Sequence, residues 1–318
     1  MSVDLSILIV SYECRDEVRE CLRSLARYPG SVSSETVVVD NGSTDGTAEM
    51  IAAEFPAVHL EALPENVGFG AGTNRAAAIA RGDYLLLLNP DTVVHPTTLD
   101  AIVAFARRHP DYGFYGGRTL NPDGTVHPGS CWGKPTLWST FCFATMLSSV
   151  FKRSRVFNPE SLGRWQRDSV REVDIVTGCL LLTRRSLYQE LGGFDERFFM
   201  YGEDVDLAFR ATRLGFRHVI TPEAVVTHVI GVSSSTRSDK LVLLLRGKAT
   251  LFRKHWPPGK RELGLGFLWC GIGLRTMIAS LLRRRGRDGS IASVWRPVWR
   301  ARSEWLEGYA DSPATHAR

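Results

Sequence analysis

The sequence predicts an α/β protein with a mainly parallel, doubly wound sheet and a basic helical extension at its C-terminal end. Over residues 1–110, short apolar runs alternate with amphipathic helical patterns, which is typical of a parallel sheet with helices on both faces. The charge then changes along the chain: residues 237–318 hold 17 Lys and Arg against 6 Asp and Glu, whereas residues 1–236 hold 22 against 28. We therefore expect one large domain over residues 1–236 and a basic extension over 237–318.

The composition narrows the class of protein. The 318 residues are 44% hydrophobic and 23% charged, which favours one large globular domain with an appendage over several equal domains. The six cysteines form no Cys-x-x-Cys or Cys/His cluster, so neither a structural zinc site nor a disulfide framework is expected. The chain runs from Met1 into a strand-like segment without a basic stretch, so we expect no secretory signal and a cytoplasmic location.

Strand-like and helix-like segments alternate regularly in the first third of the chain. Strands are expected at residues 5–11, 36–39, 58–62 and 84–88, and helices at 15–27, around 48–52 and at 68–80. Ligands of such sheets bind at the carboxyl ends of the parallel strands. The residues expected to line one pocket there are Ser11, Tyr12, Asp40, Asn89 and Asp91.

These strand ends carry groups suited to a nucleotide and a cation. Asp40 can accept a hydrogen bond from a pyrimidine N–H or a ribose hydroxyl, and Tyr12 can stack on a base. Asp91 offers the carboxylate oxygen that Mg²⁺ or Mn²⁺ prefers. The alternative for both acids is a simple turn, because typical turn residues adjoin each of them. A nearby run at residues 66–75 contains G-x-G-x-G, which matches a dinucleotide loop only weakly.

The second half of the chain is less regular. Residues 110–172 are rich in Gly, Pro and aromatic residues and are expected to form an irregular wall of the site. Residues 174–183 predict one strand, in which Gly178 allows a ligand or a backbone to approach closely. Two short strands are expected at 216–221 and 224–229, and the second contains His228. A lone His in a strand is more often a satisfied side chain than a ligand.

The stretch over residues 198–210 leads from four apolar residues through Gly202 into the acids Glu203, Asp204 and Asp206. Apolar residues then follow at helical spacing, so the acids lie at the start of a helix. One interpretation makes Asp204 an N-cap and the other two acids first-turn residues favoured by the helix dipole. The other places the acids at the rim of the pocket described above.

Taken together and in order, these motifs resemble the inverting glycosyltransferases of family 2, which have the GT-A fold. The resemblance covers residues 5 to about 256. The motifs that carry it are Ile9-Val10-Ser11-Tyr12, residues 39–46 (VDNGSTDG), Asn66-Val67-Gly68-Phe69, Asn89-Pro90-Asp91, residues 192–196 (GGFDE), residues 201–206 (YGEDVD) and His228. Asn89 departs from the pattern, because many members have Asp there, and the metal site would have one carboxylate fewer.

The resemblance implies a nucleotide-sugar part over residues 1–110 and an acceptor part over 111–236. Asp204 is the implied general base, with Glu203 beside it in the catalytic centre, and Asp91 and His228 are the implied ligands of Mg²⁺ or Mn²⁺. The implied nucleotide-binding residues are Ser11, Tyr12, Asp40, Asn66, Gly68 and Asn89. Asn-Pro-Asp resembles the rhamnosyltransferase-like branch, so the expected donor is dTDP-L-rhamnose, with a UDP-sugar as the alternative. The expected acceptor is a glycan linked to polyprenyl diphosphate.

The C-terminal extension suggests a membrane surface. Residues 263–282 are mostly apolar, but Arg275 and four glycines argue against a spanning helix and favour an interfacial or re-entrant one. We expect the Arg cluster at 283–287 and three tryptophans, Trp295, Trp299 and Trp305, at the interface, on the inner face of the plasma membrane. The alternative is that this helix packs on the catalytic domain or on a second copy in a homodimer.

Two other classes of protein compete with this interpretation. A sugar nucleotidyltransferase would carry a Gly-rich, basic signature directly after the first strand, where this chain has Ser11-Tyr12-Glu13-Cys14. A non-catalytic assembly or nucleic-acid-binding protein could use the basic extension, but that extension lacks a recognisable nucleic-acid-binding motif. We therefore expect no nucleic-acid partner.

Overall fold

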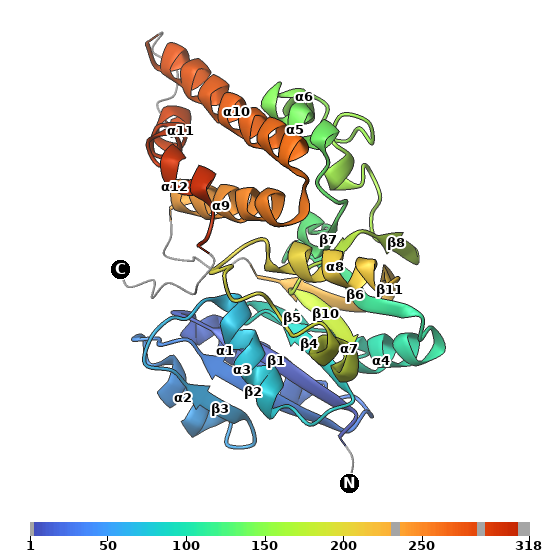
Figure 1. Ribbon diagram of the computed structural model, residues 1–318. Coiled ribbons are helices and arrows are strands. Elements are labelled where there is room, and N and C mark those ends of the chain that lie inside the picture. The colour runs from blue at the N-terminus through green and yellow to red at the C-terminus, as the bar shows by residue number, and fades with distance from the viewer. Residues whose placement is uncertain (1–2, 230–235, 285–289, 311–318) are drawn as a thin grey trace.

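The computed structural model describes residues 3–229, 236–284 and 290–310, and the side chains of 283–292 are not described. The described residues form a nine-stranded sheet in the order β3-β2-β1-β4-β10-β6-β11-β5, with β8 paired to β11 and helices on both faces (Figure 1). A second, two-stranded sheet pairs β7 with β9. The strands are β1 (Leu5–Ser11), β2 (Ser34–Asp40), β3 (His59–Ala62), β4 (Tyr84–Leu88), β5 (Thr92–Val94), β6 (Tyr112–Leu120), β7 (Cys131–Trp132), β8 (Arg171–Val173), β9 (Ile175–Val176), β10 (Leu180–Arg184) and β11 (Arg217–His228).

Strand direction decides where the site can form. Strands β3, β2, β1 and β4 are parallel, β10 is antiparallel to both β4 and β6, and β6 is parallel to β11. The carboxyl ends of β1, β2, β4, β6 and β11 therefore meet at one edge of the sheet, and β10 begins at that edge. The predicted strands at 5–11, 36–39, 58–62 and 84–88 are confirmed within two residues at each end.

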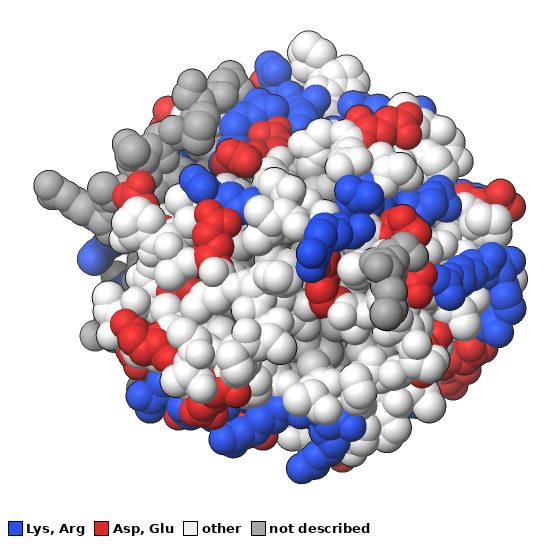
Figure 2. All heavy atoms as spheres, turned by 90° about the horizontal axis from the view of Figure 1, so that it is seen from below, with Lys and Arg blue, Asp and Glu red and all other residues white. Residues whose placement is uncertain are grey.

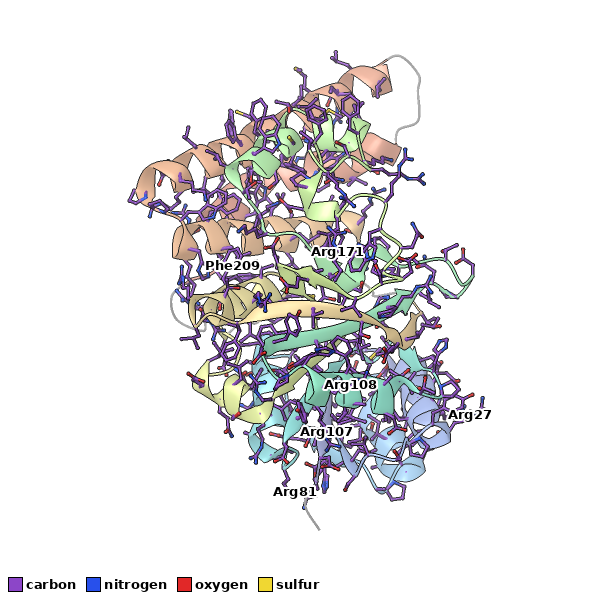
Figure 3. The ribbon with its side chains drawn as sticks, turned by 90° about the vertical axis from the view of Figure 1, so that its right-hand side faces the viewer. Arg27, Arg81, Arg107, Arg108, Arg171 and Phe209 are labelled. Atoms are coloured by element: carbon purple, nitrogen blue, oxygen red, sulfur yellow. The ribbon has the colours of Figure 1, made fainter. Side chains whose placement is uncertain are left out.

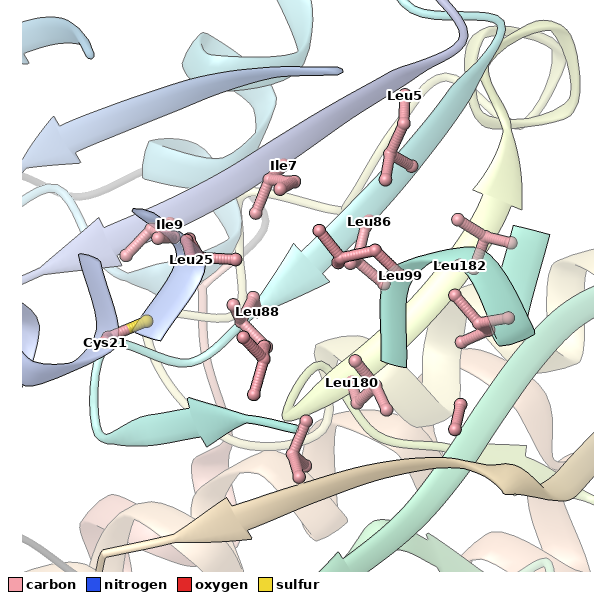
Figure 4. Close-up of a cluster of buried hydrophobic side chains, with 14 of the residues drawn as sticks. Leu5, Ile7, Ile9, Cys21, Leu25, Leu86, Leu88, Leu99, Leu180 and Leu182 are labelled. Atoms are coloured by element: carbon pink, nitrogen blue, oxygen red, sulfur yellow. The ribbon is translucent and has the colours of Figure 1, made fainter. Parts of the chain in front are cut away.

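Helices cover the two faces of this sheet with separate apolar cores. Helices α1, α2 and α4 lie over one core, which contains Ile7, Leu86 and Leu180 from neighbouring strands (Figure 4). Helices α3, α7 and α8 lie over the other core, which contains Leu8 and Leu85 from the opposite faces of the same strands. The helices are α1 (Arg15–Arg27), α2 (Thr47–Glu54), α3 (Phe69–Ile79), α4 (Thr98–Arg108), α5 (Leu137–Ala144), α6 (Leu147–Val150), α7 (Arg185–Glu190), α8 (Glu203–Arg213), α9 (Arg237–His255), α10 (Pro258–Arg284), α11 (Ser290–Arg300) and α12 (Arg302–Glu307), with 3-10 turns at Pro128–Ser130 and Pro159–Ser161.

The structure corrects three expectations for the second half of the chain. The stretch over residues 110–172, expected to be irregular, contains the central strand β6. Its glycines weaken the strand signal in the sequence. Gly117 is explained by a distant contact, since a Cβ there would lie 2.4 Å from the Ala224 carbonyl oxygen. The single strand expected over 174–183 is two strands that join different sheets, β9 and β10, broken at residues 177–179. The two short strands expected after residue 215 are one strand, β11, with a register shift against β6 between Ile220 and Val225.

Helices α9 to α12 form a layer beyond the sheet, and α5 packs into it (Figures 1 and 3). A third apolar core lies in this layer and also includes Phe198, which leads into the acidic stretch. Trp305, expected at a membrane interface, is fully buried and donates its indole N–H to the Val298 carbonyl oxygen at 2.9 Å, so that expectation was wrong. The domain division at residue 236 stays a prediction: α9 begins at Arg237, but the extension shares its core with the body.

Helix α10 has the length and composition of a membrane-crossing helix. Within the described ranges, Pro258–Leu282 meets both criteria, and a third of its most apolar stretch is buried. Arg275 is buried rather than exposed: its guanidinium lies 4.0 Å from the centroid of the Phe143 ring and donates to the Gly271 carbonyl oxygen at 3.0 Å. Burial lowers the pKa of Arg275 to about 10. The expected Arg cluster at 283–287 lies outside the described side chains.

Candidate active site

Asp40 and Tyr12 meet at the carboxyl ends of the neighbouring strands β2 and β1. Asp40 is buried, and its Oδ1 accepts hydrogen bonds from the hydroxyls of Ser11 at 3.0 Å and Ser43 at 2.7 Å. The Ser43 N–H donates to the other carboxylate oxygen at 3.0 Å. Tyr12 is about half exposed. The structure therefore brings the predicted base-binding residues together, with the carboxylate held rigidly and the phenol ring accessible.

Asn66 and Gly68 hold the neighbouring loop in place. The side-chain oxygen of Asn66 accepts hydrogen bonds from the Asn41 amide at 3.0 Å and from the Gly68 N–H at 2.9 Å. Gly68 has a φ of +91°, and a Cβ there would lie 2.5 Å from the Phe199 carbonyl oxygen. These internal contacts are enough to explain why asparagine and glycine occupy positions 66 and 68. A contact of Asn66 or Gly68 with a nucleotide therefore stays a prediction.

Asp91 and His228 form a pair at the ends of β4 and β11. The His228 Nε2 lies 3.1 Å from the Asp91 Oδ1, and both side chains are mostly buried. The backbone ties the pair together, because the Val229 N–H donates to the Asp91 carbonyl oxygen at 2.8 Å. Asn89, two residues before Asp91, donates its N–H to the Cys179 carbonyl oxygen at 3.3 Å. The structure therefore places the predicted metal ligands side by side.

The pair fits a partial site for a hard divalent cation. Among the residues that the structure describes, no group of three or more His, Cys, Asp or Glu side chains is arranged to hold a metal. Mg²⁺ and Mn²⁺ sites nevertheless commonly take one or two protein ligands, and phosphate oxygens and water complete them. The buried Nδ1 of His228 has no hydrogen-bond partner in the described part of the chain, which leaves a nitrogen lone pair or N–H unsatisfied at this site.

His127 was missed by the sequence analysis and lies against this pair. Its ring centroid is 4.9 Å from that of His228, and its Nδ1 accepts a hydrogen bond from the Gly129 N–H at 3.2 Å. Burial lowers the pKa of His127, and the neighbouring His228 lowers it further. No local sequence signal marks His127, because β6 is what brings it to the site. His127 follows the end of β6 in the chain, and its N–H donates to the Thr119 carbonyl oxygen at 2.9 Å.

Asp204 points from the first turn of α8 toward the start of β10. The helix begins after Gly202, which is its N-cap with a φ of +106°, so the interpretation of Asp204 as an N-cap was wrong. Instead, the Asp204 Oδ2 accepts a hydrogen bond from the Gly178 N–H at 3.1 Å. Its buried Oδ1 has no partner among the described residues. Asp204 thus presents an unpaired carboxylate oxygen.

The electrostatics separate Asp204 from its neighbour Glu203. Burial raises the pKa of Asp204 to about 6, and the Gly178 N–H opposes this shift. Burial and the adjacent Asp204 charge raise the pKa of Glu203 well above its ordinary value. The Gly178 N–H favours the charged form of Asp204, whereas the charge of Asp204 favours the protonated form of Glu203. With a pKa of about 6, Asp204 is largely ionised at neutral pH.

Asp206, two residues further along α8, is a structural carboxylate. It is fully buried, and its Oδ1 lies 2.6 Å from the Lys254 Nζ and 2.7 Å from the His255 Nε2. Its Oδ2 accepts from the Arg210 Nε at 2.8 Å. Burial opposes ionisation, but the hydrogen bonds from His255 and Lys254 outweigh it and lower the pKa of Asp206. This residue fastens α8 to α9.

Residues 178 and 179 link Asp204 to Asn89, which lies two residues before Asp91. Gly178 donates its N–H to Asp204, and the carbonyl of the next residue, Cys179, accepts from the Asn89 N–H. A Cβ on Gly178 would lie 2.9 Å from the Phe69 ring, so glycine is required for this close approach, as the sequence predicted. An ionised carboxylate, a candidate cation site and an open aromatic ring therefore line one edge of the sheet.

The model of the family described as Glycosyl transferase family 2 matches residues 6–192, more than half of the chain. The chain belongs to glycosyl transferase family 2. It is therefore a glycosyltransferase, as its ordered motifs indicated.

This glycosyltransferase is similar to curated proteins of bacterial glycan synthesis. It is 34% identical over 241 residues to the N-acetylglucosaminyl-diphospho-decaprenol L-rhamnosyltransferase of Mycobacterium tuberculosis, covering 70% of this chain and 75% of that protein. It is 32% identical over 244 residues to the O-antigen biosynthesis protein RfbC of Myxococcus xanthus, covering 74% of this chain but 18% of that longer protein.

The solved structures support the fold. A mannosyltransferase from Pyrobaculum calidifontis, solved in complex with GDP-Man and Mn²⁺, superimposes with a TM-score of 0.53 at 19% identity, over 96% of this chain and 86% of that one. The glycosyltransferase therefore has the predicted GT-A fold, with a mainly parallel sheet flanked by helices. At this identity the likeness extends to the fold and to nothing finer.

Proposed function

We propose that this glycosyltransferase is a metal-dependent, inverting enzyme that moves L-rhamnose from dTDP-L-rhamnose to a lipid-linked glycan in the synthesis of a cell-surface polysaccharide. The observation that carries the chemistry is the unpaired Oδ1 of Asp204. Its other oxygen is bonded to Gly178, and the next residue, Cys179, is bonded to Asn89, two residues before Asp91 of the Asp91–His228 pair. The choice of sugar and acceptor is supported by the similarity to the mycobacterial rhamnosyltransferase.

The nucleotide of the donor binds at the carboxyl ends of β1, β2 and β4 in this proposal. Tyr12 stacks on the base, and Asp40, fixed by its serine partners, accepts from the base or ribose. Ser11, Asn66, Gly68 and Asn89 complete the nucleotide side of the site. A dTDP donor and a UDP donor share the pyrimidine N–H, so these residues do not distinguish the two.

Asp91 and His228 hold Mg²⁺ or Mn²⁺ in this proposal. A cation bound there would offset the charge of the departing nucleotide diphosphate. Around that position the chain's own residues exclude water: both side chains are mostly buried, and His127 packs on the imidazole of His228.

Asp204 is the proposed general base. The acceptor hydroxyl loses its proton to the unpaired Oδ1 as its oxygen attacks the anomeric carbon, and the bond from that carbon to the diphosphate oxygen breaks. A pKa of about 6 leaves Asp204 ionised at neutral pH yet basic enough to take the proton. Burial and the charge of Asp204 raise the pKa of Glu203 beside it, which favours the protonated form of Glu203 and limits repulsion between the two carboxyls. A single displacement needs no protein nucleophile and inverts the anomeric carbon.

The proposed setting is the cytoplasmic face of the plasma membrane, with peripheral attachment through the C-terminal extension. Its supports are the apolar helix α10, which passes the length and composition test for a membrane helix, and a relative whose name includes a decaprenol-linked substrate. The proposed acceptor is accordingly a glycan on polyprenyl diphosphate. Nucleic acid has no part in this proposal.

Thermal melting with nucleotides tests the donor site first. The protein is melted with dTDP, UDP and GDP, each with and without Mn²⁺. A ligand at a hundred times its dissociation constant adds about 2.7 kcal/mol to the free energy of unfolding, which raises the melting temperature by at least several degrees for a domain of this size. A shift with dTDP that needs Mn²⁺ is expected, and transfer from dTDP-L-rhamnose to a lipid-linked acceptor is then assayed.

The variants Asp91→Ala and Asp111→Ala separate the metal site from general effects. Asp91→Ala should abolish the Mn²⁺-dependent part of the shift, whereas Asp111→Ala, an exposed acid at the start of β6 and far from the edge that holds the site, should keep it. A larger shift with UDP than with dTDP would change the proposed donor to a UDP-sugar. No shift with any nucleotide would refute the donor site altogether.

A further inference from the structure

Five aromatic rings form a continuous line across the helical layer, and we call it the aromatic ridge. It starts at Phe267 on α10, whose ring centroid lies 5.5 Å from that of Phe141 on α5. Trp138, one turn earlier on α5, stacks on Phe141 at 5.5 Å and lies 6.4 Å from Phe157. Phe157 lies 5.0 Å from Phe151, directly after α6. The ridge thus joins the C-terminal extension to residues 138–157 of the catalytic body.

The outer end of the ridge is exposed and apolar. Val150 is 70% exposed and Val156 60%, while Phe151 and Trp138 are 47% and 46% exposed. The segment that carries Val150, Phe151 and Val156 is held against α5, because the Trp138 indole N–H donates to the Val156 carbonyl oxygen at 2.7 Å. On α10, which packs on α5, further exposed apolar residues follow, namely Leu263, Met277 and Leu281. Contiguous exposed apolar patches of this kind mark interaction surfaces.

Basic side chains border the exposed end of the ridge. Lys152, Arg153 and Arg155 lie between Phe151 and Val156 in the chain, and all three are exposed. Within the described ranges none of the three forms an ion pair with an acidic side chain. The patch therefore combines apolar residues that can enter an interface with cations that can reach an anionic layer above it.

We propose that residues 138–157 form a second membrane-docking element that binds an anionic lipid surface through the aromatic ridge and its basic border. It acts beside α10 and lies far from the C-terminal extension in the sequence. This inference deepens the proposed function, since a lipid-linked acceptor would reach the enzyme along the surface on which this element docks. Figure 1 shows α5, α6 and α10 together at the end of the molecule opposite the N-terminus.

The arrangement favours a lipid surface over a second copy of the chain. In a symmetric dimer the same patch would face itself, which brings Lys152, Arg153 and Arg155 against their own equivalents. Like charges placed opposite one another cost binding free energy. An anionic surface has the complementary sign, and partly exposed Trp and Phe side chains are the ones that settle at membrane interfaces.

The inward position of Arg275 supports docking along α10. The guanidinium lies between the rings of Phe143 and Trp295, at 4.0 and 5.7 Å from their centroids, so the helix presents no charge from its middle to the lipid. Its exposed residues Leu263, Met277 and Leu281 follow a helical spacing that continues the patch. In contrast, the opposite end of the molecule carries interspersed acidic and basic residues around a largely uncharged area (Figure 2).

Sedimentation with lipid vesicles tests the proposal on the full-length protein. Binding is measured to vesicles of phosphatidylcholine and to vesicles of equal parts phosphatidylcholine and phosphatidylglycerol. Arg153→Glu combined with Arg155→Glu should weaken binding to the anionic vesicles by about tenfold or more. Val150→Ser combined with Phe151→Ser should weaken it to a similar degree, because buried apolar area is lost.

Matched controls come from the exposed surface of the body. Ile79→Ser removes an equally exposed apolar side chain from α3, and Arg27→Glu reverses a charge at the end of α1 that Figure 3 shows away from the helical layer. Both should leave vesicle binding within about twofold. The nucleotide-induced thermal shift should survive in every variant, so a failed sugar transfer and a failed docking element give different results.

Two outcomes would overturn the proposal. Equal binding of the wild type and the two double variants, at residues 150/151 and 153/155, to anionic vesicles would show that residues 138–157 are not needed for docking and that α10 or the segments around it suffice. A change of the ridge variants from dimer to monomer in analytical ultracentrifugation, without a change in vesicle binding, would identify the patch as the interface of a homodimer.

Discussion

The two sides of the first turn of α8 carry the same functional group in opposite environments. Toward the sheet edge, Asp204 has one carboxylate oxygen bonded to a backbone N–H and the other unpaired, and its pKa is raised to about 6. Toward α9, the carboxylate of Asp206 contacts the side chains of Lys254, His255 and Arg210, and these contacts lower its pKa. Both side chains are largely shielded from water, so the difference comes from the partners.

If Asp204 is the general base that we propose, one short acidic stretch serves two purposes. A carboxylate with saturated partners stabilises the fold and has no free lone pair for chemistry. A carboxylate with an unsatisfied oxygen reduces stability and is available to take a proton, which is the usual trade between stability and function at active sites. The extension supplies two of the partners of Asp206, Lys254 and His255, and so it holds the helix that carries Asp204.

Replacing Asp204 with Asn should have the largest effect. Sugar transfer should fall by about 10²- to 10⁴-fold, because the proposed proton acceptor is removed. Dissociation constants for the nucleotide with Mn²⁺, measured by titration calorimetry, should stay near the wild-type value, and the melting temperature should not fall. Asp111→Asn provides the exposed control. Transfer at the wild-type rate in Asp204→Asn would remove this residue from the mechanism.

Replacing Asp206 with Asn should instead act on stability. Its loss leaves Lys254 and Arg210 without this counter-charge and the buried His255 without its hydrogen-bond partner, which costs about 3–5 kcal/mol of unfolding free energy. Asp16→Asn is the matched control on α1, where the partner Arg19 lies at 2.6 Å but the acid is exposed, and it should cost at most about 0.5 kcal/mol. Urea denaturation measures both. Equal stability of the two variants would contradict the structural role of Asp206.

Gly247→Ala should break the contact between the extension and the acidic stretch. A Cβ at Gly247 on α9 would lie 1.9 Å from the Tyr201 carbonyl oxygen, so the stretch that leads into Asp204 must move. We expect a loss of about 1–3 kcal/mol in stability and a lower rate of transfer.

The helix α10 offers the control for this glycine. At Gly266 an added Cβ meets no described atom within 4 Å, and Gly266→Ala should stabilise by about 0.5–1 kcal/mol through helix propensity. If both alanine variants behaved alike, the extension would not hold the acidic stretch through this contact.

Much of the fold was predictable because its signals are local. Continuous β-branched and leucine runs predicted β1, β2 and β4, and these strands bury both faces as expected. β6 was missed because its glycines weaken a strand signal and are explained only by contacts with distant residues such as Ala224. Leu214 lies at a helical spacing from Leu207 and Ala211 that suggests a buried position, yet it is half exposed because it is the C-cap of α8, directly before Gly215 at a φ of +92°.

The site was predictable where several motifs converge on one sheet edge. The positions of Tyr12, Asp40, Asp91 and His228 followed from strand order and from the family resemblance. Only the family resemblance singled out Asp204. The residue pattern alone did not separate the roles of Asp204 and Asp206, because their partners come from Gly178 and from α9, far away in the chain. His127 escaped for the same reason.

The pH dependence sharpens the comparison between the two acids. In the proposed mechanism transfer requires ionised Asp204, so the rate should fall about tenfold per pH unit below a midpoint near 6, measured as kcat at saturating donor. The stability of the fold depends on pH in the opposite direction for Asp204. Above pH 3.8 the unfolded chain releases a proton that the folded state keeps, so the free energy of unfolding falls as the pH rises from 3.8 to about 6. Asp206, with its lowered pKa, stabilises at neutral pH and loses that contribution as the pH falls. Asp204→Asn should therefore gain stability relative to wild type at pH 7 but not at pH 4, and Asp206→Asn should lose it at pH 7. A kcat that stays flat to pH 5 would mean that the proton acceptor is a different group.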